Sequence, residues 1–477
     1  MRKTKIIGTL GPVSNNEKTI EEMIKSGMNV ARLNFSHGDH DYHQNSIDLV
    51  KRVREKLKVP VAILMDTKGP EIRLKNFKDS KTVTLNRGQK FTLTTDDILG
   101  DENIAGISFK DLPSQIKAGD NILIDDGKVS MVVDDTTDKE IHCTVKIGGK
   151  ISGHKGVNIP HVHLEIDYLS QKDEEDIIFG IKNDVDFIAA SFVRCKEDII
   201  SLRKFVDYHG GHKIKLISKI ENIEGVENFN EILRYSDGIM VARGDMGVEI
   251  EYERLPGIQK KFINKCYQSG KMVITATQML ESMITNATPT RAEITDVANA
   301  VFDGTSAIML SGETAIGVHP AHVVSVMAKI AEQAEADAFE MNIYHGIKYD
   351  MDNTDITNAI CDAACTTARD VNANAIIAVT KSGHTARRVS KFRPLEKIIA
   401  ATPNLKTYYQ LSLSWGVYPV LALNQHDSDG LFRHAIDCAR QEDLVSPGDT
   451  VVITAGVPLN VEGTTNLLKV QIVEGWK

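Results

Sequence analysis

Three charged residues follow two apolar segments of the sequence and could together bind a divalent cation. Lys219 and Glu221 lie two positions apart after segment 214–218, and Asp245 follows segment 238–242. Residues spaced by two on an extended chain project to the same side, so both side chains could face one site. Two carboxylates completed by water and substrate oxygens suit Mg²⁺, and Lys219 would supply positive charge to a transferring phosphoryl group. The alternative interpretation is a Lys219–Glu221 ion pair that braces the surrounding structure.

A second group of oxygen-bearing side chains lies at the carboxyl ends of two earlier apolar segments, 29–35 and 61–65. Neutral oxygens with a single carboxylate suit a weakly charged cation such as K⁺, and this set consists of Asn34, Ser36, Asp66 and Thr67. Glu71 lies close by, and such a cation would offset the repulsion between its carboxylate and an anionic substrate. Turn and cap positions are the structural alternative for all of these residues.

The remaining candidates bind anions or carry protons. Gly244 and Asp245 belong to a Gly-Asp-Met-Gly turn that is expected to open a short helix, whose N–H groups can hold a carboxylate or phosphate. Candidate phosphate binders, the arginines through their bidentate guanidinium, are Arg32, Arg73 and Lys155. Thr277 and Ser311 could orient a water or pass a proton, although buried hydroxyls more often bond to a backbone carbonyl.

The elements that position these residues are short apolar segments alternating with amphipathic helices. This pattern predicts a parallel sheet covered by helices, with strands at 5–9, 29–35, 61–65, 187–191, 214–218, 238–242, 272–276 and 307–310. Eight such units predict a (β/α)8 barrel, whose active site lies at the carboxyl ends of the strands. Most of the candidate residues follow these predicted strand ends.

Two further regions interrupt and extend the barrel. Residues 70–166 contain short strands separated by turns, which predicts a small antiparallel β-barrel domain inserted after strand three. Residues 346–477 predict a C-terminal open α/β domain, in which segment 380–387 follows a strand and opens a helix. The catalytic barrel is then expected to comprise residues 1–69 and 167–345.

The composition excludes some classes of function. The 477 residues are 42% hydrophobic and 25% charged, and 56 Lys plus Arg against 65 Asp plus Glu give a net charge of -9. This balance argues against nucleic acid or an anionic membrane as the main partner. No signal peptide or membrane-spanning run is visible, and the six cysteines form no CxxC pair. We therefore expect a cytoplasmic protein with reduced thiols.

Six motifs in the predicted order closely resemble the signatures of the pyruvate kinase family. They are NVARLNFSHG at 29–38, MDTKGPEIR at 65–73, ISKIEN at 217–222, MVARGDMG at 240–247, ATQMLES at 276–282 and MLSGETA at 309–315. The similarity extends from the first residues to Gly463-Thr-Thr-Asn466 near the end of the chain. It implies transfer of the phosphoryl group of phosphoenolpyruvate to ADP, which yields pyruvate and ATP in the last step of glycolysis.

The resemblance also implies a role for each candidate. Phosphoenolpyruvate would be bound by Arg32, Gly244, Asp245 and Thr277. The catalytic residues would be Lys219, Thr277, Arg32 and Ser311. Mg²⁺ or Mn²⁺ would be held by Glu221 and Asp245, and K⁺ by Asn34, Ser36, Asp66 and the Thr67 carbonyl. The nucleotide would be bound by Arg73, Lys155, His37 and Asp126, with the inserted domain acting as a lid. Glu71 implies dependence on K⁺, because potassium-independent members carry lysine there.

The family further implies allosteric regulation and a homotetramer. A sugar phosphate or nucleotide effector would be bound by Thr380, Lys381, Ser382, Gly383, His384 and Thr385, although a plain capped turn is the alternative for this segment. Two other functions stay open at this point. One is a different Mg²⁺-dependent barrel that handles phosphoenolpyruvate or pyruvate, such as a lyase, and the other is a non-catalytic sugar-phosphate sensor.

Overall fold

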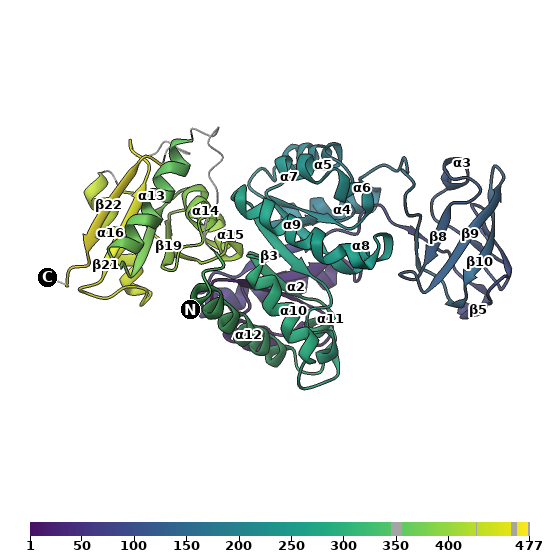
Figure 1. Ribbon diagram of the computed structural model, residues 1–477, viewed down its shortest axis with the longest axis horizontal. Coiled ribbons are helices and arrows are strands. Elements are labelled where there is room, and N and C mark those ends of the chain that lie inside the picture. The colour runs from purple at the N-terminus through teal and green to yellow at the C-terminus, as the bar shows by residue number, and fades with distance from the viewer. Residues whose placement is uncertain (345–354, 426, 459–464, 476–477) are drawn as a thin grey trace.

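The computed structural model describes residues 1–344, 355–425, 427–458 and 465–475. Three bodies lie in a row, with a helix-covered barrel between a small β-domain and a C-terminal α/β domain (Figure 1). The predicted boundary between residues 345 and 346 lies outside the described residues.

The central body is a closed barrel of eight parallel strands in the order β1-β17-β16-β15-β14-β13-β3-β2. The strands are β1 (Lys5–Thr9), β2 (Val30–Asn34), β3 (Ala62–Asp66), β13 (Phe187–Ala190), β14 (Lys215–Ile220), β15 (Gly238–Ala242), β16 (Met272–Ala276) and β17 (Ala307–Leu310). Both faces of these strands are buried, inside the barrel and beneath the helices, which explains their continuous apolar sequences. The predicted (β/α)8 barrel is confirmed.

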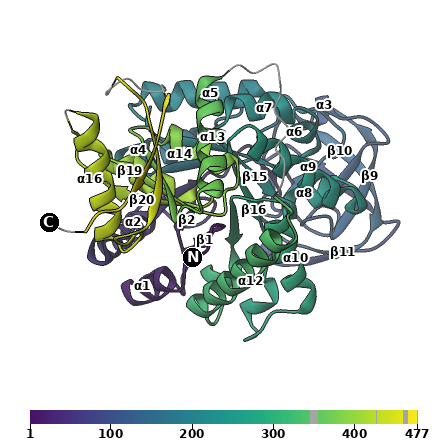
Figure 2. The ribbon, with the colours of Figure 1, turned by 60° about the vertical axis from the view of Figure 1, so that its left-hand side comes forward.

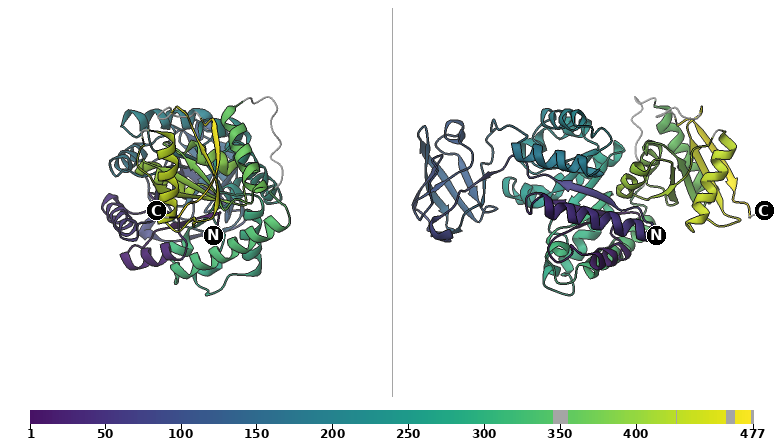
Figure 3. Two further views of the ribbon diagram at one scale, coloured as in Figure 1. Left: turned by 90° about the vertical axis from the view of Figure 1, so that its left-hand side faces the viewer. Right: turned by 180° about the vertical axis from the view of Figure 1, so that it is seen from behind.

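The helices cover the outside of the barrel (Figure 3). They are α1 (Glu17–Lys25), α2 (His40–Leu57), α4 (Gln171–Lys182), α5 (Lys196–Tyr208), α6 (Ile223–Glu227), α7 (Phe229–Tyr235), α8 (Arg243–Glu249), α9 (Leu255–Gln268), α10 (Arg291–Phe302), α11 (Gly312–Ala315) and α12 (Pro320–Glu340). Side-chain caps fix several starts: Asp39 accepts from the N–H of Tyr42, so α2 begins at His40. Ser170 and Thr290 form capping boxes at α4 and α10.

The inserted domain follows β3. Its elements are β4 (Ile72–Arg73), β5 (Val83–Leu85), β6 (Lys90–Thr94), β7 (Ile104–Gly106), α3 (Leu112–Gln115), β8 (Asn121–Ile124), β9 (Val129–Thr136), β10 (Glu140–Ile147), β11 (Gly149–Ile151) and β12 (Gly156–Asn158). Seven strands are ordered β4-β12-β8-β9-β10-β6-β7, and a bridge between Leu74 and Ile107 joins the two edges of this sheet. The prediction of an antiparallel domain is wrong for one pair, because the chain crosses over after β6 and β7 runs parallel to it.

The C-terminal body has a five-stranded sheet of order β20-β19-β18-β21-β22, in which β22 alone is antiparallel to its neighbour. Its elements are α13 (Ile356–Asp370), β18 (Ala375–Val379), α14 (His384–Lys391), β19 (Lys397–Thr402), α15 (Leu405–Gln410), β20 (Val417–Leu421), α16 (Ser428–Gln441), β21 (Thr450–Ala455) and β22 (Leu467–Ile472). Alternate strand residues face opposite sides: Ile377 packs with residues of α16, and Ile376 with residues of α13 and α14. Figure 2 shows α16 and α13 on opposite sides of this sheet. The predicted open α/β domain is confirmed.

This domain adjoins the barrel beside the N-terminus (Figure 1), and polar side chains join the two bodies. Lys5 Nζ, on β1, donates to the Val417 carbonyl at 2.7 Å, and Arg393 Nη2 donates to the Gly304 carbonyl at 2.8 Å. Lys406 Nζ lies 3.3 Å from the carboxylate of Asp186. Within the described ranges, no helix has both the length and the apolar character needed to cross a membrane.

Candidate active site at the mouth of the barrel

The carboxyl ends of the barrel strands carry a buried chain of oppositely charged side chains. Arg32 Nη2 lies 2.6 Å from Asp66 Oδ2, and the other oxygen of Asp66 lies 3.0 Å from Lys219 Nζ. Lys219 Nζ also lies 3.0 Å from Glu221 Oε1. The structure therefore contains the Lys219–Glu221 ion pair of the alternative interpretation, and it extends that pair to Asp66 and Arg32.

This chain of charges fixes the protonation state of Lys219. Burial lowers the pKa of Lys219, but Asp66 and Glu221 outweigh it, so the pKa lies above that of an ordinary lysine. Burial likewise raises the pKa of Asp66, while Lys219 and Arg32 hold it below the usual value. Lys219 is thus a fixed positive charge at neutral pH, and Asp66 a fixed negative one.

Glu221 experiences the opposite balance. Burial raises the pKa of this carboxyl, Lys219 lowers it, and the negative charges of Asp245 and Asp66 raise it again, so that it lies above the usual range. Asp245, in the first turn of α8, is one of the charges that act on Glu221. Carboxylates that repel one another in this way create a place that favours a cation.

The end of β13 contributes a residue that the sequence analysis missed. Ser191 Oγ accepts from Lys219 Nζ at 2.7 Å and donates to the Thr67 carbonyl at 2.7 Å. The backbone N–H of Phe192 donates to Glu221 Oε2 at 2.7 Å. The rule that barrel sites lie at strand ends could have identified Ser191, because it directly follows the strand 187–190.

The oxygens expected to hold K⁺ lie on neighbouring strands. Asn34 and Asp66 are directly paired in the register of β2 and β3. Asn34 Oδ1 accepts from the N–H of Ser36 at 3.2 Å, and Ser191 Oγ also approaches Asp66 Oδ1 at 3.2 Å. These four residues, Asn34, Ser36, Asp66 and Thr67, therefore share one edge of the barrel mouth with Arg32.

Thr277 is held in a strained conformation between β16 and α8. Its φ of 67° is in the left-handed region, where a β-branched residue is an outlier. Its hydroxyl donates to the Ala276 carbonyl at 2.7 Å and accepts from the N–H of Gly244 at 2.8 Å. Arg243, which the sequence analysis did not single out, donates to the Thr277 carbonyl at 2.6 Å and pairs with Asp296 at 2.7 Å.

Ser311 and Glu313 lie at the end of β17. The N–H of Ser311 donates to Glu313 Oε2 at 2.7 Å, and the N–H of Leu280 donates to Glu313 Oε1 at 3.1 Å. Glu313 is buried, and its two hydrogen bonds link the loop after β16 to the loop after β17. Glu313 therefore holds the backbone of Ser311 in place, and the Ser311 hydroxyl takes part in neither of these two bonds.

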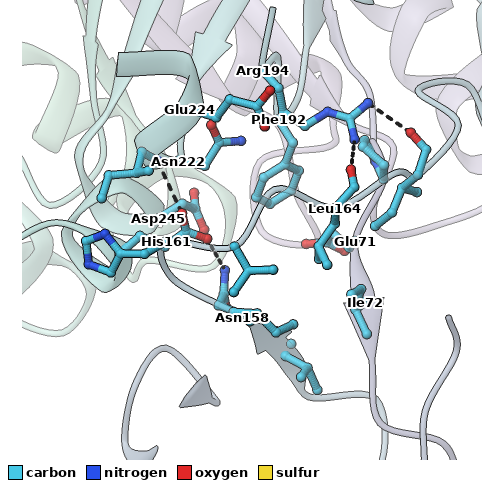
Figure 4. A pocket seen from close by; sticks show the side chains of 18 of the residues that line it. Glu71, Ile72, Asn158, His161, Leu164, Phe192, Arg194, Asn222, Glu224 and Asp245 are labelled. Carbon is cyan, nitrogen blue, oxygen red and sulfur yellow. Dashed lines mark hydrogen bonds between the residues drawn. The ribbon is translucent and has the colours of Figure 1, made fainter. Parts of the chain in front are cut away.

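A cavity of about 130 Å³ separates the barrel mouth from the inserted domain (Figure 4). Its wall includes Asp245 from α8, Glu71 after β3, and Asp126 from the inserted domain. Arg194 holds the segment that returns to the barrel, since it donates to the carbonyls of Leu164 at 3.1 Å and Ile166 at 2.9 Å. The cavity is the space in which groups of the inserted domain can meet those of the barrel.

The structure does not bring all four residues expected to contact the nucleotide to one place. Arg73 and Lys155 are neighbours on the paired ends of β4 and β12, and each bonds to a carboxylate, Glu71 at 2.6 Å and Asp125 at 2.9 Å respectively. Asp126 lies in the cavity wall. His37 is exposed on the barrel, where its carbonyl accepts from His43 Nε2 at 2.8 Å.

The segment expected to bind an effector forms the turn between β18 and α14. The N–H of Gly383 donates to Thr380 Oγ1 at 3.0 Å, and the Lys381 carbonyl accepts from Thr407 Oγ1 at 2.9 Å. Thr385 Oγ1 lies 2.7 Å from Thr465 Oγ1. Burial, with Arg388 and Arg387 nearby, lowers the pKa of His384. Ser382 and the rest of this turn lie at the carboxyl edge of the parallel strands, where open α/β sheets bind ligands.

Comparison with known proteins agrees with this architecture. A family model described as the barrel domain of pyruvate kinase matches residues 1–324, and a model of the pyruvate kinase alpha/beta domain matches residues 358–471. The chain is 49% identical over 475 residues to pyruvate kinase of Clostridium acetobutylicum, which covers 99% of this chain and 100% of that protein. Its identity to pyruvate kinase of Clostridium perfringens is 46% over 473 residues, with coverages of 99% and 100%.

The fold leads to the same group of proteins. A crystal structure of a pyruvate kinase from Cryptosporidium parvum superimposes with a TM-score of 0.91 at 40% sequence identity, over 99% of this chain and 96% of that one. Sequence, fold and the order of the motifs at the strand ends thus agree, and the chain belongs to the pyruvate kinase family.

Proposed function

We propose that this protein transfers the phosphoryl group of phosphoenolpyruvate to ADP at the mouth of the barrel. The observation that carries the proposal is the buried chain Arg32–Asp66–Lys219–Glu221, which lies beside Asp245 and opens toward the inserted domain. Phosphoryl transfer requires positive charge held in place around an anionic group. Two fixed cations next to a pair of carboxylates that favour a metal ion meet that requirement.

Glu221 and Asp245 fit a magnesium ion. Burial raises the pKa of Glu221, and repulsion from Asp245 adds to this effect; a divalent cation would relieve the repulsion. Among the described residues no three His, Cys, Asp or Glu side chains are grouped for a metal. A site with two carboxylates leaves the other coordination positions to water and substrate, as Mg²⁺ prefers. When bound, Mg²⁺ or Mn²⁺ would neutralise charge on the substrate oxygens.

The oxygens of Asn34, Ser36, Asp66 and Thr67 fit a potassium ion. Three of the four residues contribute neutral oxygens, and the one carboxylate is already shared between Arg32 and Lys219. A divalent ion would be strongly repelled by the positive charges of Arg32 and Lys219, whereas a monovalent ion carries half that charge and is repelled less. Bound K⁺ would supply positive charge beside the phosphoryl group.

Arg32 and Lys219 stabilise the phosphoryl group during its transfer. Arg32 is buried and oriented by Asp66 and by Thr9, whose hydroxyl accepts from Nη1 at 3.0 Å. Because the raised pKa of Lys219 keeps it protonated, it acts as a charge and not as a proton donor. The side chains that could deliver a proton to the enolate are therefore Thr277 and Ser311.

Thr277 can act in this way only after a change of hydrogen bonding. Its hydroxyl proton is engaged by the Ala276 carbonyl, and its oxygen accepts from the N–H of Gly244. Substrate that displaces the bond to the Ala276 carbonyl would free the proton, which a water could relay. We assign Gly244 and Asp245 to substrate binding at the same helix start, although the helix is short and acts through its specific side chains and N–H groups.

The inserted domain would close over the nucleotide. Arg73 and Lys155 are oriented by Glu71 and Asp125 in the structure, and each is the sequence neighbour of a residue of the cavity wall, Ile72 and Gly156 respectively. Asn158 Nδ2 already donates to Glu249 Oε1 at 3.2 Å, which joins the domain to α8. Nucleotide phosphates would take the place of these carboxylates, with Asp126 and His37 at the margins of the site.

A coupled assay of pyruvate formation tests the proposal. We expect pyruvate only with phosphoenolpyruvate, ADP and a divalent cation together, and a strong increase on adding K⁺. Pyruvate formation that does not require ADP would indicate a lyase and refute the assignment. The same assay with sugar phosphates and nucleoside monophosphates addresses the effector, which we place at residues 380–385.

We also propose a homotetramer in the cytoplasm. A groove between α9 and α10 is bordered by Tyr252, whose side chain is 85% exposed, and Ile294 on α10 is also exposed. Such apolar exposure suits contact with a second copy. Light scattering should give about four times the chain mass of 52.7 kDa; a monomeric mass would contradict the proposal.

A further inference from the structure

A small cavity lies at the junction of the barrel and the C-terminal domain, remote from the barrel mouth. Its lining comes from both bodies and includes Lys271 at the start of β16, Arg387 and Lys391 of α14, and Arg393, Ser414 and Trp415. The volume of about 10 Å³ accommodates one water-sized particle. The cavity is therefore too small for a phosphate or a metabolite.

Three buried polar groups in this lining have no hydrogen-bond partner within the described part of the chain. They are the indole Nε1 of Trp415, the Oγ of Ser414 and the Nε of Arg393. The three residues are only 1%, 2% and 6% exposed. An indole N–H and a guanidinium N–H can only donate, and a buried donor left without a partner is costly. Three polar groups on residues of the lining, two of them obligate donors, therefore lack a partner among the described residues.

The charges around the cavity are all positive. Four of the lining residues are cations, Lys271, Arg387, Lys391 and Arg393, and no lining residue is acidic. Burial lowers the pKa of Arg393 to about 10, and Tyr344, Tyr267 and Glu335 offset this effect only in part. Burial also lowers the pKa of Arg387, which is influenced from farther away by Asp237. A water would satisfy the donors but would leave this excess charge in place.

We propose that the cavity is a binding site for one small monovalent anion of the size of chloride. The anion accepts from the Trp415 indole, the Ser414 hydroxyl and the Arg393 guanidinium, and charge-assisted bonds of this kind are among the stronger hydrogen bonds of proteins. Monatomic anions fit a space of one particle, whereas sulfate, phosphate and carboxylates do not.

The position of Arg393 gives the site a structural consequence. Its φ of 50° is in the left-handed region, and its guanidinium bonds to the Ser390 carbonyl in one domain and to the Gly304 carbonyl in the other, both at 2.8 Å. Its guanidinium also stacks on Trp415 at 4.5 Å from the ring centre. An anion held by both residues therefore stabilises the docking of the C-terminal domain on the barrel.

Thermal unfolding of the full chain in two salts tests this proposal. Potassium chloride and potassium gluconate are compared at equal concentration, so that K⁺ and ionic strength are constant and only the fit of the anion differs. Binding to the folded state raises the unfolding temperature in chloride, saturably, by on the order of 2–4 °C. Equal unfolding temperatures in the two salts overturn the proposal.

Matched variants and diffraction locate the effect. Trp415→Phe and Ser414→Ala each remove one donor and are expected to abolish the difference between the salts. Tyr418→Phe is the control, because it removes the 2.8 Å bond to the Arg2 carbonyl at the same junction but lies outside the cavity lining. If Trp415→Phe does not fold, the difference between the salts measured for Ser414→Ala alone decides whether the anion site exists. Crystals grown in bromide should show an anomalous peak beside Trp415 Nε1, and its absence contradicts the site.

Discussion

Replacing Lys219 by methionine separates a catalytic charge from a structural brace. The side chain is 9% exposed and its Nζ lies 3.0 Å from both Asp66 and Glu221. Methionine preserves the length and apolar stem but removes the charge. Asp66 keeps Arg32 as a partner at 2.6 Å, so the variant does not leave that carboxylate alone.

The expected loss follows from the electrostatics of the site. A unit charge 4 Å from a developing negative charge contributes about 4 kcal/mol at an effective dielectric constant of about 20. At about 1.4 kcal/mol per factor of ten, turnover should fall on the order of 10³-fold. Glu221 loses a competing cation at the same time, so affinity for Mg²⁺ should be unchanged or higher.

Steady-state kinetics with metal titration measures both quantities. Lys215→Met is the control, because Lys215 lies on the same strand and pairs with Asp237 at 2.9 Å at the opposite end of the barrel. Turnover of Lys219→Met within a few-fold of the control would show that the charge of Lys219 is not catalytic. A loss of turnover that only follows a loss of folded protein would show that Lys219 is a structural brace.

Three other predictions concern separate parts of the molecule. Thr277→Val should lower turnover on the order of 10²-fold while Thr277→Ser, which keeps the hydroxyl, should not; equal rates in the valine and serine variants would remove Thr277 from proton delivery. Glu71→Lys should make the rate independent of K⁺ and, because it breaks the 2.6 Å pair with Arg73, raise the KM for ADP; a rate that still requires K⁺ would contradict the role of Glu71. Burial, with Arg2 nearby, lowers the pKa of Lys5 to about 7. Between that pKa and the ordinary value of 10.5, the unfolded state therefore binds more protons than the folded state. The free energy of unfolding should rise with pH over that interval. Lys5→Met should reduce that slope by up to about 1.4 kcal/mol per pH unit, as measured by denaturant titration of both proteins at several pH values.

Strands of the barrel were predictable because each is a continuous apolar segment with a polar boundary. The bounds of β15, β16 and β17 agree with the segments 238–242, 272–276 and 307–310. Burial on both faces imposes this pattern whatever the partners of the strand are. The positions of Lys219, Glu221 and Asp245 at the mouth follow from the same regularity.

Short strands of the inserted domain were not predictable in the same way. The strands β4, β7 and β12 have two or three residues each, and β4 and β12 pair with each other from opposite ends of the domain's sequence. Contacts within the site depend on register as well. Asp66 is shared by Arg32 and Lys219 because β3 lies beside β2 and is separated from β14 by β13 alone, and Ser191, which follows β13, completes this arrangement. No local pattern in the sequence encodes that sharing.

The charges at the mouth imply that metal and substrate bind together. Arg32 and Lys219 contribute two positive charges, and Asp66, Asp245 and the ionised form of Glu221 contribute three negative ones, so the site carries about −1 once Glu221 has lost its proton. An anionic substrate is therefore opposed until a cation is present, and the cation is held more tightly once the anion has arrived. Linkage requires the two effects to be equal in free energy. Calorimetric titration of Mg²⁺ with and without phosphoenolpyruvate should show tighter binding of the metal in its presence, on the order of tenfold, which is about 1.4 kcal/mol. Equal affinities would mean that the carboxylates are neutralised from within the protein, and the charge balance derived from Glu221 and Asp245 would then be wrong.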